Sequence, residues 1–558
     1  MADNYSRKVL YLETDSSGSK DNCIESPLPR ARVVICDLSN RFRQTLIIDT
    51  FLSLKTRQIE LPRMKILLFA LLISFLPFIC TGQDGYGNSW ILGYPTTVDI
   101  SGTYLNFNNK PVTVSPLQKD MQMEGSVIVM SNSTGDLLFY SNGCYIAKKD
   151  HEMMFNGDSL GMGLLETSFC ETGGNPITQG IMALPVPLDS NRYYMFYTDL
   201  NSAYEYPTGL YFPLAPLNLY YCIIDMSSNN GQGSITLKNQ VIVADTLARG
   251  MIQATRNNNG IDWWIVMPES HSNCYYTIRL NKNGIDTIFK QCIGEIWGDR
   301  DATGQAVFST NGKIYSRSNY FNGLNIFDFN AGTGILSNPK HITFGQDTFY
   351  WSGAAFSPNS RFLYITAYRK VFQFDVNSLD IGASKVLIAE LNTPAEIDFN
   401  TSFNQALLAP DGNIYIGGTN THTYLHIIQN PNCKGTDCNL VQYALEMPAY
   451  NIYGLPNIPN FIEWNEDDTC DISVNTNFDK ITFEFKVFPN PFIEEVFIEG
   501  NPPYSIVLFD ALGKSISKTR FYSVTGSITL TNQPTGLYYY QILVNNEIEK
   551  AGILVKIE

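Results

Sequence analysis

The feature that most constrains the fold of this 558-residue chain is a turn-and-strand module that recurs along it. Each copy has a turn built from Asn, Asp, Ser, Gly or Pro, followed by a run of aromatic and branched residues. The copies span 131–141, 188–197, 256–266, 308–315, 356–365 and 408–416. Their turn residues 135, 191, 260, 312, 360 and 412 are 56, 69, 52, 48 and 52 residues apart. A period of about 50 residues in a strand-rich chain predicts a β-propeller.

The residue types in these turns follow from the backbone conformations that a tight turn requires. The segments 357–360, 409–412 and 309–312 each need a tight reversal between antiparallel strands, where Gly and Asn accept positive φ and Pro presets the first turn angle. We expect seven blades rather than six or eight. The seventh would combine residues of about 98–124 with those near 440–463, closing the ring without a free sheet edge.

Composition supports an all-β chain. Aromatic residues make up 13% of it, and charged residues only 16%, against about 25% in an average globular protein. Long runs of helix-forming residues are missing, so strands and turns are favoured over helices. We expect one large propeller at 90–463 and one small domain at the C-terminus.

Residues 64–82 have the order of a signal peptide. Met64-Lys65 is basic, Ile66–Ile79 is almost wholly apolar, and small residues lead to a cleavage point between Gly82 and Gln83. The apolar run is shorter than the ~20 residues of a membrane helix. We interpret residues 1–63 as a mis-called extension and Met64 as the start; a buried apolar segment or an internal anchor is the alternative.

The net charge excludes some partners. Residues 1–82 hold 11 Lys/Arg and 8 Asp/Glu, which leaves 27 and 45 in the remainder, a net charge of −18. Nucleic acids and anionic membrane surfaces require a positive field, so neither is an expected partner. The mature chain has no expected transmembrane span and no expected cofactor, although a structural cation would suit its acidity.

Eight cysteines remain after the leader, an even number that favours disulfides in an exported chain. Cys433 and Cys438 are the expected local pair, because the glycine-containing loop between them can bring their Cα atoms within bridging distance. Zinc is the weaker interpretation, since no second Cys or His pair stands at ligand spacing.

Acidic residues gather ahead of several turn modules, which would place them at one rim of the propeller channel. They are Glu124, Asp299, Asp301, Glu396 and Asp398. One interpretation is a polar or cation-binding site at that rim. The other is that these are solvated loop charges and hydrogen-bond partners between blades.

The common catalytic motifs GxSxG, HExxH and the P-loop do not occur. His422 and His426 lie in a segment whose Thr, Tyr and branched residues favour a strand. Four positions along a strand span about 13 Å, too far for one metal ion.

The C-terminal residues form a second targeting signal, in addition to the predicted signal peptide. Pro489-Asn490-Pro491 stand near the start of this part, Gly513-Lys514 close an LFDxxGK turn, and Gly536 and Tyr538 begin a GLYYYxI strand. This order resembles the C-terminal sorting domain of bacterial type IX secretion, the Por secretion tail family. The resemblance implies a small immunoglobulin-like β-sandwich at 486–558, after an acidic linker at 464–485. It also implies handling by the type IX machinery and export to the cell surface or beyond.

The propeller carries a further resemblance. Gly135–Gly143 (GDLLFYSNG) looks like the first-blade segment of secreted, gliding-motility-associated propeller proteins, and 454–457 with 461–462 looks like their closing segment. That likeness implies surface roles without a general catalytic assignment. We therefore expect a binding, adhesion or scaffold module for an extracellular protein or glycan. The alternative is an exported hydrolase or lyase acting on polysaccharide or peptide, with rim carboxylates as acid and base.

Overall fold

The computed structural model describes residues 23–28, 31–36 and 85–558, except 95–99, 162, 164–168, 172, 203–213, 299–303, 320, 345–351, 393–400, 469, 471–484, 501–503, 522–524 and 545–546. The predicted signal peptide, with Gly82 and Gln83, lies outside the described residues. Residues before it contribute one described hairpin, β1 (Cys23–Leu28) with β2 (Ala31–Cys36). No helix among the described residues is long and apolar enough to cross a membrane.

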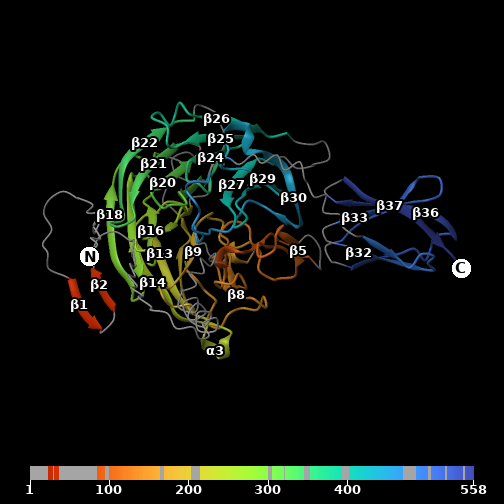
Figure 1. Cartoon of the computed structure of the whole chain (residues 1–558), viewed down its shortest axis with the longest axis horizontal. Coiled ribbons are helices and arrows are strands. Elements are labelled where there is room, and N and C mark those ends of the chain that lie inside the picture. The colour runs from red at the N-terminus through yellow and green to blue at the C-terminus, as the bar shows by residue number, and fades with distance from the viewer. Residues whose placement is uncertain are drawn as a thin grey trace, which may run out of the picture. The chain divides into compact units, whose positions relative to one another are not determined.

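Among the described residues, seven antiparallel sheets of three or four strands follow one another between residues 89 and 451, as the propeller prediction requires (Figure 1). The first is β3 (Ser89–Leu92), β4 (Gly102–Asn106) and β5 (Thr113–Leu117), and the second is β6 (Ile128–Ser131), β7 (Leu137–Ser141) and β8 (Ile146–Lys148). The third is β9 (Ile181–Pro185), β10 (Arg192–Thr198), β13 (Asn218–Asp225) and β14 (Ser234–Ala244). The fourth is β15 (Gln253–Arg256), β16 (Trp263–Pro268), β17 (Cys274–Asn281) and β18 (Gly284–Cys292).

The last three sheets also have four strands each. The fifth is β19 (Gly304–Phe308), β20 (Ile314–Asn319), β21 (Gly323–Asn330) and β22 (Ile335–Ile342). The sixth is β23 (Ser352–Phe356), β24 (Phe362–Ala367), β25 (Lys370–Asp375) and β26 (Val386–Glu390). The seventh is β27 (Phe403–Leu408), β28 (Ile414–Gly418), β29 (His422–Ile428) and β30 (Leu440–Asn451). Small pieces between the sheets are η1 (Gly85–Gly87), η2 (Gly435–Cys438), α3 (Ser228–Gly231) and the short pair β11 (Asn201–Ser202) with β12 (Leu214–Ala215).

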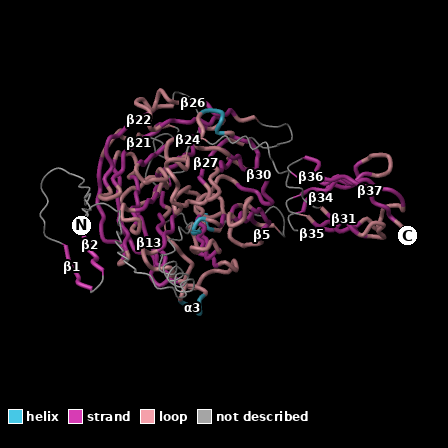
Figure 2. Tube along the Cα trace, viewed as in Figure 1, coloured by secondary structure: helices cyan, strands magenta, loops and turns pink. Residues whose placement is uncertain are grey.

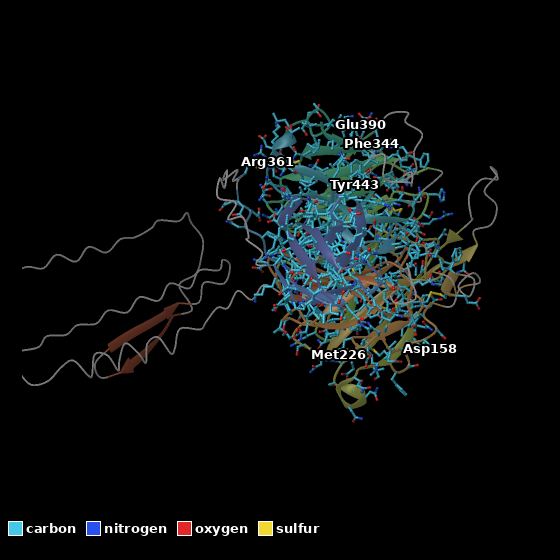
Figure 3. All side chains as sticks on the ribbon, turned by 90° about the vertical axis from the view of Figure 1, so that its right-hand side faces the viewer. Asp158, Met226, Phe344, Arg361, Glu390 and Tyr443 are labelled. Atoms are coloured by element: carbon cyan, nitrogen blue, oxygen red, sulfur yellow. A yellow bond between two sulfur atoms is a disulfide. The ribbon has the colours of Figure 1, made fainter. Side chains whose placement is uncertain are left out.

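Each of the six turn modules connects the first and second strands of a sheet, from the second sheet to the seventh. The first strands of neighbouring sheets contact one another from the first sheet to the third and from the fourth to the seventh, and these strands surround the channel. Burial decreases outward in the fourth sheet: its second strand β16 is buried at all six positions, whereas its outer strand β18, apart from the buried Gly284, alternates between half-buried and exposed positions. Figure 3 shows Asp158 and Met226 on the opposite side of the ring from Phe344 and Glu390.

The ring closes differently from the prediction. Residues 89–117 form a sheet of their own, and residues 440–451 are the outer strand β30 of the seventh sheet, so the two segments do not share a blade. The ends of the ring meet at a backbone bridge between Tyr94 and Tyr450 and at a hydrogen bond from Ala449 N to Thr103 Oγ1 at 3.2 Å. The segment 454–461 then passes inward, where Phe461 packs against Trp263 and Tyr86 at ring-centroid distances of 5.6 and 5.4 Å.

The C-terminal part is a small β-sandwich, as expected, and Figure 2 shows it as strands joined by loops. One sheet consists of β31 (Lys486–Phe488), β32 (Glu495–Glu499) and β35 (Thr525–Thr529). The other consists of β34 (Ser515–Phe521), β33 (Tyr504–Phe509), β36 (Gly536–Val544) and β37 (Glu547–Lys556). Ile498, Ile506 and Ile542 are fully buried between the two sheets.

Three disulfides are present among the described residues: Cys144–Cys170, Cys274–Cys292 and Cys433–Cys470. The predicted Cys433–Cys438 bridge is therefore wrong. The intervening residues wind into η2, and Cys438 is a buried free thiol, while Cys433 bonds a cysteine from the predicted linker. Local spacing permitted the predicted bridge, but the side chains are directed elsewhere.

The start of the predicted linker is fastened to the propeller. Glu466 forms an ion pair with Lys313 at 3.0 Å, and Asn359 Nδ2 donates to the Asp468 carbonyl oxygen at 3.0 Å. Together with Cys433–Cys470, these contacts hold the chain against the sheets up to residue 470.

Candidate functional site

Of the five predicted rim acids, only Glu124 lies within the described residues. Its backbone N–H donates to the Gly173 carbonyl oxygen at 3.3 Å. A methyl group on Gly173 would lie 2.4 Å from the Glu124 carboxyl carbon, so a glycine lets the loop pack on the acid. Burial raises the pKa of the Glu124 carboxyl. Asp299, Asp301, Glu396 and Asp398 lie outside the described residues, so the predicted cluster stays a prediction.

Tyrosines stand near Glu124. Its charge raises the pKa values of Tyr94 and Tyr453, although burial is the larger cause for both and brings that of Tyr453 to about 12. The Tyr94 hydroxyl bonds the Thr421 hydroxyl at 2.6 Å, and its ring lies 6.0 Å from that of Tyr450. Glu124 is therefore a half-buried acid near phenols that stay protonated at neutral pH.

The channel is filled by Asn457. Its Nδ2 donates to the carbonyl oxygens of Ile181 at 2.8 Å and Ile252 at 3.0 Å. Its Oδ1 accepts from Gln253 at 2.8 Å and from Gln179 at 3.3 Å. One fully bonded side chain thus joins the inner strands of the third and fourth sheets to the closing segment.

Glutamines continue this network around the channel. Gln179 exchanges two hydrogen bonds with the backbone of Ala306, at 3.0 and 2.9 Å. Gln305 accepts from the N–H groups of Ala354 and Ala406, each at 3.0 Å, and donates to the Ala406 carbonyl oxygen at 2.7 Å. Gln405 accepts from the N–H of Leu455 at 2.8 Å. The cavity that remains among these residues is about 20 Å³, room for about one water molecule.

This network of side-chain amides was not predicted from the sequence, although the chain carries a signal for it. Gln253, Gln305 and Gln405 are each followed by alanine and stand seven residues before the turn glycines 260, 312 and 412. A side-chain amide at a fixed place in several repeats can pair with backbone groups of neighbouring sheets.

An open groove of about 530 Å³ lies between the first and second sheets, drawn in orange in Figure 1. These two sheets have three strands each, against four in the other five. The groove is lined by Tyr104, Asn106, Asn108, Leu117, Asn132, Gly135, Asp136, Leu137, Leu138, Lys149 and His151. Its volume falls within the ~300–1,000 Å³ of small-molecule sites.

The walls of the groove are rigid. Asn132 Oδ1 accepts three hydrogen bonds within its turn, from Thr134 N and Oγ1 and from Asp136 N, at 2.7 to 3.0 Å. Asn108 Nδ2 donates to the Gly135 carbonyl oxygen at 3.0 Å. A Cβ at Gly135, where φ is +90°, would lie 2.0 Å from Asn108 Oδ1, so only glycine fits.

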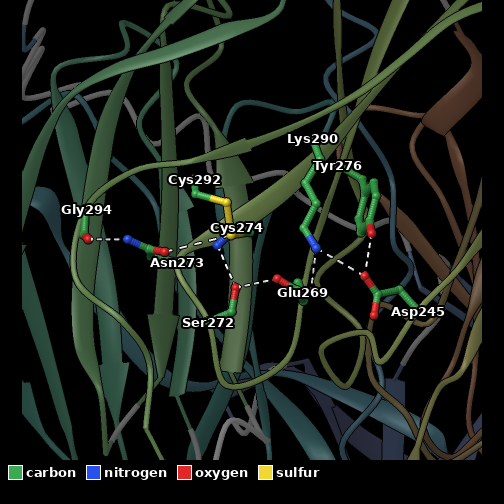
Figure 4. Close-up of a disulfide and its surroundings, with 9 residues drawn as sticks. All are labelled: Asp245, Glu269, Ser272, Asn273, Cys274, Tyr276, Lys290, Cys292 and Gly294. Carbon is green, nitrogen blue, oxygen red and sulfur yellow. Dashed lines mark hydrogen bonds and ion pairs between the residues drawn. A yellow bond between two sulfur atoms is a disulfide. The ribbon is translucent and has the colours of Figure 1, made fainter.

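A second charged cluster, beside Cys274–Cys292, is internally paired (Figure 4). The Lys290 ammonium bonds Asp245 at 3.1 Å and Glu269 at 2.6 Å, and the Tyr276 hydroxyl donates to Asp245. These bonds connect the loops around the fourth sheet.

Among the described residues, no group of three or more His, Cys, Asp or Glu is placed to hold a metal ion. His422 and His426 lie on strand β29, as expected, and accept backbone N–H groups.

Several predicted sorting residues have structural contacts. Asn490 Nδ2 donates to the Ile553 carbonyl oxygen at 2.8 Å, and its Oδ1 accepts from Val555 N at 2.9 Å. Tyr538 is buried and donates to the Pro534 carbonyl oxygen at 2.5 Å. Gly513 has φ +81° in the turn before the exposed Lys514, and Gly536 has φ +146°. Pro489 and Pro491 flank Asn490 between β31 and β32.

Comparison with known proteins identifies the tail. Residues 486–556 match the family model of the secretion system C-terminal sorting domain. This domain marks the chain for export by type IX secretion to the cell surface or extracellular space. No curated protein matches the chain.

Solved structures resemble the chain weakly. A functionally unknown protein from Desulfotomaculum acetoxidans is 11% identical, with a TM-score of 0.30, over 61% of this chain and 86% of that one. The periplasmic gluconolactonase of Pseudomonas aeruginosa is 10% identical, with a TM-score of 0.32, over 79% and 98%. A gluconolactonase from Xanthomonas campestris is 10% identical, with a TM-score of 0.27, over 60% and 93%. Likeness at this level carries no argument about function.

Proposed function

We propose that this type IX secretion cargo acts outside the cell as a binding module, with its propeller as the binding part. The observation that carries the proposal is the filled channel. Asn457 and the glutamine network leave about 20 Å³ there, too little for a substrate. The open groove between the first two sheets is large enough for a small ligand or a protruding part of a partner.

We also propose that residues 64–82 act as a signal peptide and are removed during export. Cleavage would fall between Gly82 and Gln83. At the other end of the propeller, the chain is held against the sheets as far as Cys470 by its disulfide to Cys433. An exported binding protein gains from such fastening, because a rigid module loses less entropy when it binds.

The test is affinity capture with the purified exported protein. It is immobilised and incubated with solubilised outer-membrane proteins and extracellular polysaccharides from the producing cells. We expect at least one component to be retained reproducibly and released by soluble exported protein. A propeller that retains nothing from either fraction would contradict the proposal.

One observation favours a hydrolase or lyase as the second candidate. Glu124 is a half-buried carboxyl whose pKa is raised by burial, and a protonated carboxyl can act as a general acid. Glu124→Gln keeps the shape of the side chain and removes its proton chemistry. Turnover of polysaccharide or peptide substrates that disappears in this variant, with the fold intact, would establish the enzyme over the binding module.

A further inference from the structure

The groove between the first and second sheets offers a particular chemistry. One wall is the face of the first sheet that carries Tyr104 and Asn106, two positions apart on β4, with Leu117 beside them on β5. Leu137 and Leu138 from the second sheet add further apolar surface. The groove therefore combines an aromatic ring and three leucines with amide, carboxylate and ammonium side chains.

The Tyr104 ring is fixed in place. Its hydroxyl bonds the Ser89 hydroxyl at 2.9 Å, and its ring packs against a buried apolar cluster that includes Ile91 and Met123 while it also lines the groove. Aromatic faces of this kind pack against apolar C–H surfaces while neighbouring groups form hydrogen bonds.

The polar groups at the rim are few and of both signs. Asp136 is an exposed carboxylate held ionised, since hydrogen bonds from Thr134 and Asn132 lower its pKa. Lys149 is exposed nearby, and its charge also lowers the Asp136 pKa. The Asn106 Oδ1 accepts from Asn108 N at 2.9 Å, which leaves the amide Nδ2 as a donor directed by a fixed side chain.

This combination selects against acidic ligands. The Asp136 carboxylate and the net charge of −18 outside the leader oppose an acidic polymer. A neutral pyranose presents an apolar C–H face and a ring of hydroxyls that both donate and accept, which matches an aromatic wall beside a carboxylate, an amide and an ammonium group.

We propose that this groove binds a short stretch of neutral glycan, with a sugar ring on Tyr104 and its hydroxyls bonded by Asp136 and Asn106. The inference rests on the proposed binding function and names its ligand class. The preformed walls at Asn132 and Gly135 keep the site open without rearrangement.

The test is calorimetric titration of the exported protein with neutral hexasaccharides: cellohexaose, laminarihexaose, maltohexaose and mannohexaose. A hexamer of galacturonic acid is the charged comparison. We expect at least one neutral hexasaccharide to bind and the acidic hexamer to bind at least about tenfold more weakly.

Groove variants locate the binding. Tyr104→Ala should weaken it at least about tenfold, while Tyr104→Phe, which keeps the ring, should hold it within about threefold of the parent. Asn106→Ala gives a second groove variant in case Tyr104→Ala unfolds. Tyr424→Ala, a half-buried tyrosine on β29, is the matched control and should bind normally.

Three results would overturn the inference. Neutral hexasaccharides that fail to bind at millimolar concentration exclude the glycan class. Binding that survives both Tyr104→Ala and Asn106→Ala places the glycan elsewhere. Preference for the acidic hexamer reverses the charge argument. If affinity capture still retains a surface protein in any of these cases, the proposed binding function stands and only this inference fails.

Discussion

Asn457 donates from its Nδ2 to the carbonyl oxygen of Ile181 at 2.8 Å, across the channel around which the sheets are arranged. The same side chain bonds Ile252, Gln253 and Gln179. Asn457→Ala leaves these buried groups unpaired, so we expect the free energy of unfolding to fall by roughly 3 kcal/mol. Urea unfolding followed by tryptophan fluorescence measures this change.

Asn460→Ala is the matched control for that variant. Asn460 lies three residues further along the same segment, is half-buried, and donates only at 3.3 and 3.4 Å. We expect a loss of about 1 kcal/mol or less. Equal losses of unfolding free energy in the two variants would show that the hydrogen bonds of Asn457 in the channel do not contribute more to stability than those of Asn460.

The disulfide pattern makes a second prediction. A non-reducing digest of the exported protein should yield a peptide containing Cys433 joined to one containing Cys470. Cys222 and Cys438 are buried free thiols, so alkylation should reach them only after denaturation. A Cys433–Cys438 loop peptide, or alkylation of Cys438 in the native protein, would contradict the structure.

The hairpins of the propeller were predictable because their causes are local. The segments 357–360 and 409–412 each carry the turn residues that a reversal needs, and both connect the expected strands, β23 with β24 and β27 with β28. The sandwich was predictable for the same reason, since its strands alternate and its Asp510–Lys514 turn is short.

What could not be predicted depends on contacts between distant residues. The closing segment lies beside residues nearly 280 positions away, as between Asn457 and Gln179, with a separation of 278. Cys470 lies in a segment with no strand pattern, so nothing local favoured it over Cys438 as the partner of Cys433. The groove depends on two sheets having three strands, which hydrophobic periodicity does not reveal.

Acid should destabilise the propeller through His422 and His426. Burial lowers the pKa of His422 to about 4 and, with a smaller contribution from His422, that of His426 to about 3. In the unfolded chain both would titrate near 6.5. Below about pH 6.5 the unfolded state therefore binds more protons, so stability falls as pH falls, by roughly 3 kcal/mol for His422 down to about pH 4 and roughly 5 kcal/mol for His426 down to about pH 3.

The check is the pH dependence of the urea midpoint. His426→Gln keeps an acceptor for the Tyr443 N–H and should flatten the slope between pH 6.5 and 4. His271→Gln changes an exposed histidine and should keep the parent slope. An unchanged slope in His426→Gln would show that this residue is not the source of the acid sensitivity.

The sorting domain allows structure and recognition to be separated. Asn490 joins the turn before β32 to strand β37 through two hydrogen bonds, so Asn490→Ala should lower the stability of the sandwich by about 1–2 kcal/mol. We expect a smaller exported fraction as a result, measured by immunoblot of medium and cells, with pulse proteolysis of the purified precursor reporting stability. Lys514→Ala removes an exposed side chain and should leave stability unchanged. The two variants differ in their effect on folding, so their export can be compared. Lost export in Lys514→Ala alone would assign the secretion signal to the surface of the turn. Normal stability and export of Asn490→Ala would refute the structural role of Asn490.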